Sequence, residues 1–348
     1  MALEYKSDLD QLHWAQDVVR LLDRHVNPTG MTNLSAPDPS SPPPLIRLPP
    51  ALNEIANRAV PIIISYTSHP SLHIAALASY LRGKLLATGV CEDFLPRDHR
   101  LAFIDFETAA RGGEARAWYK LGRDYEVMGD LGRAKDCFQR GQAKGECEST
   151  YVSHLPFLSL WSYLASTDDQ RLGMAYLLGQ LGLNIDPYAA VPLLRQAYQN
   201  ADIDCPQPAY VYGMLLAGEL DIPSHIPPNL VLPSNTHDTA ALAAQHAQAR
   251  DALERAAYLS LPQAQYKCGW MYEHAAYGCS YDPLVSVQWY SLASQGGEIE
   301  ADMALSKWFL CGADGQFGKN EKLARTFAEK AARKGHQNGA FAMGYYAE

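Results

Sequence analysis

The sequence lacks the cysteine pattern of a secreted or zinc-binding protein. Its seven cysteines are spread over 348 residues without a Cys-x-x-Cys pair or a regular spacing. Disulfide frameworks and structural zinc sites depend on such spacings. Several cysteines, such as Cys137 and Cys268, fall at apolar helical positions. We therefore expect reduced, buried thiols and a cytoplasmic location.

The sequence also lacks a basic patch, a signal peptide and a long apolar run. The net charge is −9 and no dense block of Lys and Arg occurs, which argues against a nucleic-acid partner. The N-terminal residues have no basic segment followed by an apolar one. The longest apolar runs, at 60–66 and 155–165, are shorter than the roughly 18 residues of a membrane helix. We expect no membrane span.

Motifs of the common enzyme classes are missing as well. The sequence contains no P-loop, no dinucleotide-binding glycine motif, no H-E-x-x-H and no G-x-S-x-G. No two acidic residues are placed so that burial would give their carboxyl groups different pKa values, as a catalytic pair requires. The histidines do not have the spacing of metal ligands. We expect no catalytic, cofactor or metal site. The residues considered and set aside are Glu146, Glu148, His154, Asp168, Asp169, His225, His237 and His246.

The sequence does contain a repeat of roughly 35–40 residues, best seen after Ala264 and again after Ala301. Each unit carries a small residue after a large apolar one in its first helix, and we call this position place eight. The gaps between successive place-eight residues are 39, 51, 40, 56, 37 and 38. These residues are Gly83, Gly122, Gly173, Gly213, Gly269, Ser306 and Gly344.

The repeat has a direct structural interpretation. A glycine where two helices cross allows their backbones to approach closely, and an aromatic three residues later fills the adjacent space. Small Ala residues near the end of the second helix let the next pair nest, and a closing Gly caps that helix in the left-handed conformation. The pattern predicts an all-α, right-handed α–α superhelical solenoid of about six helix pairs and a truncated last one.

The regions outside the regular repeats differ in composition. We predict an N-terminal helical arm at 1–25, a Pro-rich linker at 26–49 and a leading helix at 50–69. The array then covers 70–348, with irregular insertions at 152–170 and 217–238.

The insertion at 152–170 interrupts a first helix. Joining Tyr151 to Arg171 would restore a regular helical pattern, so the segment can be read as a translated intron. The alternative is a genuine apolar insertion that packs on the array. Transcript sequencing separates the two, because a dominant message that keeps these codons excludes the intron.

In helix-pair repeats the first helices line the concave face, and places five and nine point inward. This face is the candidate protein-binding site, because exposed aromatic, Met and charged residues suit a peptide or helix ligand. Alternatively, the rings only pack between neighbouring helices. We expect a Tyr266→Ala, Trp270→Ala double variant to lose binding and keep its helicity. The candidate residues are Tyr119, Arg123, Tyr210, Met214, Tyr266, Trp270, Met303, Lys307, Phe341 and Tyr345.

The unit AQYKCGWMYEHAAYGCSYDPLVSVQWYSLASQGG at 264–297 resembles the Sel-1-like repeat, a relative of the tetratricopeptide repeat. The segments at 14–22, 210–220 and 300–335 are similar to fungal chitin synthase regulatory factors and to paralogues linked to mitotic-kinase control. The last four residues contain no Cys-a-a-X prenylation box. The chain also stops inside a first helix, which suggests a truncated product.

This resemblance implies a non-catalytic scaffold that activates a chitin synthase in cell-wall or septum formation. Its partner would be the synthase or a trafficking factor, met at the cell periphery or septum through indirect membrane association. A cell-cycle kinase is the alternative partner, and an enzyme of unrecognised type is the alternative of another class.

Overall fold

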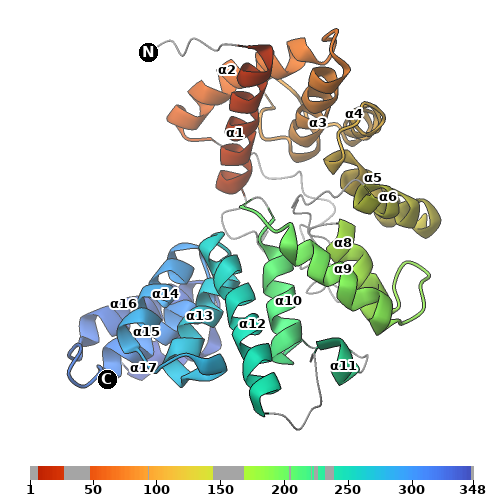
Figure 1. Cartoon of the computed structure of the whole chain (residues 1–348). Helices are drawn as coiled ribbons and strands as arrows, with labels where there is room; N and C mark the ends of the chain where they lie inside the picture. Colours follow the sequence, from red (N-terminus) through yellow and green to blue (C-terminus); the bar gives the residue numbers. More distant parts are fainter. Residues whose placement is uncertain are drawn as a thin grey trace. The chain divides into compact units, whose positions relative to one another are not determined.

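The computed structural model is all-α (Figure 1). It describes residues 7–26, 48–92, 94–143, 168–203, 205–220, 222, 226–231 and 239–345. Within these ranges no β-strand occurs, and a single isolated bridge joins Ala313 to Phe317. The linker at 26–49 and the insertion at 152–170 lie almost entirely outside the described residues.

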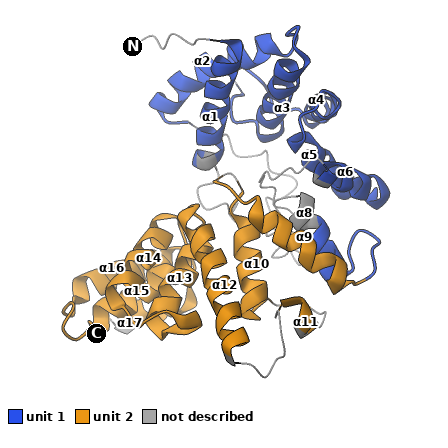
Figure 2. Cartoon of the chain, viewed as in Figure 1, with its two compact units in different colours: residues 1–184 blue, residues 185–348 orange. Residues whose placement is uncertain are grey.

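The chain divides into two compact units, Met1–Asn184 and Ile185–Glu348 (Figure 2). In unit 1, α1 packs against α2 and α3, while α3 pairs with α4 and α5 pairs with α6. The helices of unit 1 are α1 (Asp8–Val26), α2 (Pro50–Tyr66), α3 (Leu72–Thr88), α4 (His99–Arg111), α5 (Arg116–Val127), α6 (Leu131–Ala143) and α8 (Asp168–Leu178).

Unit 2 continues the same alternation of first and second helices. The α10–α12, α13–α14 and α15–α16 pairs pack closely, and α17 packs on α16. The helices of unit 2 are α9 (Pro187–Gln199), α10 (Gln207–Ala217), α11 (Pro228–Val231), α12 (Thr239–Tyr258), α13 (Pro262–His274), α14 (Pro283–Gln295), α15 (Ile299–Cys311), α16 (Glu321–Arg333) and α17 (Gln337–Tyr345).

The place-eight residues lie where the two helices of a pair cross. A Cβ at Gly122 would come within 2.5 Å of the Phe138 ring, and one at Gly269 within 2.6 Å of the Tyr290 ring. Such distances exclude any side chain unless the ring moves. Ser306 takes this place in α15, where its hydroxyl donates to the carbonyl of Ala324 in α16 at 2.8 Å. The sequence prediction of close helix crossing is confirmed at Gly83, Gly122, Gly213 and Gly269. It is wrong at Gly344, where a Cβ would meet nothing within 4 Å.

The closing glycines also behave as the repeat pattern predicts. Gly113, Gly297 and Gly335 follow the second helices α4, α14 and α16, and their φ angles are +101°, +94° and +88°. Residues with a Cβ adopt this left-handed conformation at a steric cost. These glycines therefore let the chain turn from one pair into the next.

The second helices share a start signal that the sequence interpretation overlooked. Asp98, Asp186 and Asp282 stand directly before α4, α9 and α14, and each carboxylate accepts hydrogen bonds from two backbone amides of the first turn. Asp130 and Asn320 each accept one such bond, at α6 and α16. Each cap satisfies amides that have no partner within the helix.

The segment at 217–238 joins the two helices of one pair, α10 and α12, and contains the short α11. None of the helices in the described ranges is both long and apolar enough to cross a membrane.

Candidate protein-binding face

Three of the place-five tyrosines pack on aromatic rings of the second helix in their own pair. The centroid distances are 6.1 Å for Tyr80–Phe106, 6.0 Å for Tyr119–Phe138 and 5.4 Å for Tyr266–Tyr290. The place-eight glycines of these repeats face the same second-helix rings. Tyr119 is only 3% exposed, so it serves the core of its repeat. We leave it out of the proposed surface.

Trp270, at place nine of α13, covers a buried lysine. The Lys267 ammonium lies 3.7 Å from the centre of the Trp270 ring and 2.6 Å from a carboxylate oxygen of Glu219. The hydroxyl of Tyr277 donates to the other oxygen of Glu219, and His274 stacks on Trp270 at 4.8 Å. A desolvated ammonium needs both a carboxylate and an electron-rich ring. Trp270 therefore stabilises unit 2 as well as offering a surface.

Lys307, at place nine of α15, carries an exposed positive charge. Its side chain is 67% exposed, and its ammonium lies 2.8 Å from Glu273 Oε1 on α13. The hydrogen bond to Glu273 raises the pKa of Lys307. Tyr290 donates its hydroxyl proton to the other oxygen of Glu273 at 2.7 Å. Glu273 thus keeps one partner even when Lys307 moves.

Tyr210 and Met214 occupy places five and nine of α10, and both are half-buried. Burial, followed by the nearby carboxylates Glu298 and Glu219, raises the pKa of Tyr210 to about 12. Burial and neighbouring carboxylates likewise raise the pKa of Tyr266. Both phenols therefore remain protonated hydrogen-bond donors at neutral pH.

The structure brings five of the candidates together in unit 2. Tyr210, Met214 and Trp270 pack against one core cluster, while Tyr266 and Trp270 pack against the next. Lys307 joins this group through Glu273 on α13. We call these residues, together with Met303 and Phe341, the first-helix face of unit 2.

Met303 and Phe341 belong to this face by their place in the repeat, while Arg123 and Tyr345 lie outside it. Met303 is half-buried on α15, and Phe341 on α17 is 83% exposed. Arg123 lies in unit 1, where it pairs with Glu126 of its own helix at 2.7 Å. The side chain of Tyr345 lies outside the described residues.

These contacts change the expectation for the Tyr266→Ala, Trp270→Ala double variant. Tyr266 packs on Tyr290, and Trp270 covers Lys267. Removing both rings opens the core of the pair and exposes the Lys267–Glu219 ion pair. We now expect this variant to lose stability, so a test of binding needs more exposed positions.

Asp124, beside Arg123 in α5, should contribute more to the stability of unit 1 at acid than at neutral pH. Burial raises the pKa of its carboxyl from 3.8 to about 6, although Lys120 and Arg123 oppose the shift. A pKa raised by folding stabilises the fold while the proton is bound, and this contribution is lost as the pH rises through about 6.

We therefore expect Asp124→Asn to raise the free energy of unfolding at pH 7 by up to about 3 kcal/mol, the equivalent of two pKa units. Below pH 4 the variant and the wild type should have the same stability. Urea denaturation between pH 4 and 8 measures the difference. A gain that is independent of pH would contradict the assignment.

The described residues hold no group of three or more His, Cys, Asp and Glu side chains arranged for a metal ion. His246 packs edge-on against Tyr277 at 5.3 Å. Asp168 and Asp169 begin α8. The other residues that the sequence analysis considered for chemistry, Glu146, Glu148, His154, His225 and His237, lie outside the described ranges.

The sequence analysis missed Glu219, Lys267, Glu273 and Tyr277. Lys267 and Glu273 stand three residues before and after Trp270, a spacing that places them beside it on a helix. Their partners come from other elements, so a single helix could not reveal the ion pairs. Tyr277 is reached through a turn in which Ala275 and Tyr277 both adopt positive φ.

Comparison with known proteins identifies the repeat. The Sel1 repeat family model matches four segments of the chain, at residues 76–114, 170–202, 262–298 and 299–336. The crystal structure of a Sel1 repeat protein from Oxalobacter formigenes superposes with a TM-score of 0.50 at 17% identity, covering 80% of this chain and 92% of that one. That likeness concerns the fold alone. The predicted all-α repeat superhelix is confirmed.

Two curated relatives are fungal. Chitin synthase regulatory factor 4 of Schizosaccharomyces pombe is 30% identical over 275 residues, which is 78% of this chain and 38% of that protein. Chitin synthase regulator SKT5 of Saccharomyces cerevisiae is 23% identical over 288 residues, which is 82% of this chain and 36% of that protein. The chain thus spans little more than a third of the length of either relative.

Proposed function

We propose that this chain, a Sel1-repeat protein similar to fungal chitin synthase regulators, is a non-catalytic scaffold that activates a chitin synthase. The observation that carries the proposal is the 30% identity to chitin synthase regulatory factor 4 along 78% of the chain. The partner is the synthase or a factor that delivers it, met on the cytoplasmic side of the cell periphery or septum.

The first-helix face of unit 2 supports this proposal as the contact surface. It combines half-buried rings with an exposed lysine and an exposed phenylalanine. Large rings that are already packed lose little conformational freedom on binding, and they commonly supply the strongest contacts of an interface. The buried Lys267 ammonium beneath Trp270, paired with Glu219, holds one such ring in place.

Lys307→Ala combined with Phe341→Ala tests the surface without opening the core. Lys307 is mostly exposed, Phe341 is 83% exposed, and Tyr290 still donates to Glu273 in the variant. We expect at least about a tenfold loss of affinity, because interface anchors contribute more than 1 kcal/mol each. Lys322→Ala, at an exposed position of the second helix α16, is the matched control.

The measurement has two stages. Affinity capture from the cells that make this protein should recover a chitin synthase, and titration with purified cytoplasmic segments of that synthase should show direct binding. Recovery of a mitotic kinase in its place would favour the cell-cycle alternative. Direct binding that the double variant leaves unchanged would exclude this face as the contact.

A further inference from the structure

Helix α1 packs on α3, which is the first helix of the first repeat in unit 1. Its buried side chains recur at helical spacing and form a single apolar ridge. The ridge packs on α2 and α3 and joins the same core cluster as Ile63 of α2 and Tyr80 and Leu81 of α3. The residues of the ridge are Leu12, Ala15, Val18, Val19 and Leu22.

The contacts of α1 fall on the places at which the repeat pattern expects a partner. Tyr80 and Lys84 are places five and nine of α3, and both are buried. The Lys84 ammonium lies 2.7 Å from the carboxylate of Asp23 in α1. The Arg116 guanidinium, at the start of α5, lies 5.0 Å from the centre of the Tyr80 ring. When the side-chain amide of Gln16 in α1 is oriented with its oxygen toward Arg116, that oxygen accepts a hydrogen bond from the Arg116 guanidinium at 2.7 Å.

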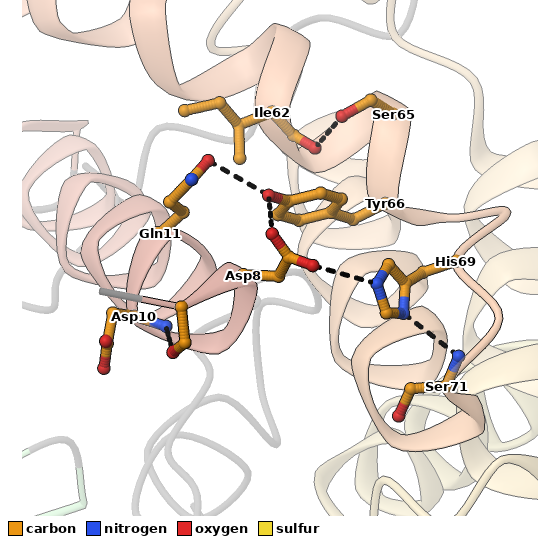
Figure 3. Close-up of polar contacts among 9 residues, drawn as sticks. Asp8, Asp10, Gln11, Ile62, Ser65, Tyr66, His69 and Ser71 are labelled. Atoms are coloured by element: carbon orange, nitrogen blue, oxygen red, sulfur yellow. Dashed lines mark hydrogen bonds and ion pairs between the residues drawn. The ribbon is translucent and has the colours of Figure 1, made fainter. Parts of the chain in front are cut away.

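Polar contacts also orient the N-terminal end of α1 (Figure 3). Asp8 accepts from the Tyr66 hydroxyl at 3.2 Å, and Gln11 accepts from the same hydroxyl at 3.0 Å. His69 Nδ1 accepts from the Ser71 amide at 3.0 Å, so the ring carries its proton on Nε2 and donates it to Asp8 at 3.3 Å. The carboxylate of Asp8 is more than half exposed, and such contacts orient a helix more than they hold it.

An amphipathic helix binds a groove through an apolar ridge that faces the groove, and α1 has such a ridge. Charged residues near the two ends of α1 set its register. Helix α1 resembles a bound ligand in a second respect. It lies apart in the sequence from the helix pairs, before the Pro-rich stretch at 26–49. A ligand tethered in this way binds at a high effective concentration, so it competes strongly with any ligand added from solution.

We propose that α2, α3 and Arg116 at the start of α5 form a helix-binding groove and that α1 is its exchangeable ligand. The groove takes an amphipathic helix with a ridge like that of α1 and a carboxylate that meets Lys84. A partner helix with these features reaches the groove by displacing α1. This inference concerns unit 1 and does not depend on the surface proposed in unit 2.

A charge reversal in the full chain tests the proposal. Asp23→Lys places two ammonium groups together at Lys84 and should release α1. Hydrogen exchange should then accelerate at least about tenfold in residues 8–26 and stay unchanged in α3 to α6. Asp17→Lys makes the same charge change at an exposed position of α1, away from Lys84. It removes only the exposed ion pair of Asp17 with Arg20 in the same helix, so exchange should change much less than tenfold.

A synthetic peptide with the wild-type sequence of residues 7–26 should bind the Asp23→Lys chain at least tenfold more tightly than the wild-type chain. Lys84→Asp should reverse the preference, so that this chain favours the peptide carrying Asp23→Lys. Three outcomes would overturn the proposal. They are protection of α1 unchanged by Asp23→Lys, loss of protection throughout α3 to α6, and a released groove that does not bind the peptide.

Discussion

Asp302→Ala should lower the free energy of unfolding of unit 2 by about 2–3 kcal/mol. Asp302 on α15 is fully buried and accepts from the Ser294 hydroxyl of α14 at 2.5 Å. Its two oxygens also lie 3.0 Å from the Lys330 ammonium and 2.9 Å from that of Lys334. One carboxylate thus joins two successive helix pairs. Truncation leaves the Ser294 hydroxyl and both ammonium groups without their shared acceptor.

The expected loss is smaller than for a wholly buried ion pair, because both lysines retain partial access to water. Glu329→Ala provides the control on α16. Glu329 pairs with Arg333 at 2.6 Å, but both side chains are exposed. That change should cost at most about 0.5 kcal/mol. Urea denaturation of both variants gives the comparison, and equal losses would show that Asp302 does not join the repeats.

Gly122→Ala should lower the free energy of unfolding of unit 1 by about 2 kcal/mol. The new methyl group would lie 2.5 Å from the Phe138 ring, which is fully buried. Overpacking of this kind costs about 1–3 kcal/mol, against a gain of up to about 1 kcal/mol in helix propensity. The steric cost should exceed the gain.

Gly132→Ala is the matched control in the helix that pairs with α5. A Cβ at Gly132 has only one neighbour, the Asp130 carboxylate at 3.7 Å, so nothing obstructs it. This variant should be more stable than the wild type by about 0.5–1 kcal/mol. Combining Gly122→Ala with Phe138→Leu should recover part of the loss. Thermal denaturation that ranks the two glycine variants equally would contradict the crossing geometry.

Sequence periodicity was sufficient to predict the helix pairs and the crossing residues. Gly83, Gly122 and Gly269 recur because each faces a large side chain of its partner helix. Gly113, Gly297 and Gly335 recur because each turn requires positive φ. These requirements arise within a single repeat, so glycine recurs at the equivalent position of successive repeats. The Asp caps of the second helices are also local, and their position before each helix would have revealed them.

The roles of the surface residues could not be read in the same way. Tyr119 and Tyr266 share place five, yet Tyr119 is buried and Tyr266 is half-buried. Lys84 and Lys307 share place nine, yet Lys84 meets α1 while Lys307 is exposed. The repeat alone cannot distinguish these cases, because the neighbours differ from one repeat to the next.

The amino-acid order thus specified an all-α array, its crossing glycines and its turns, since each depends on residues a few positions apart. Only the folded chain decided which copies of places five and nine remain accessible, where Glu219 meets Lys267, and that α1 lies against the first repeat. Those outcomes depend on contacts between segments 40 or more residues apart, where burial and charge pairing act through space.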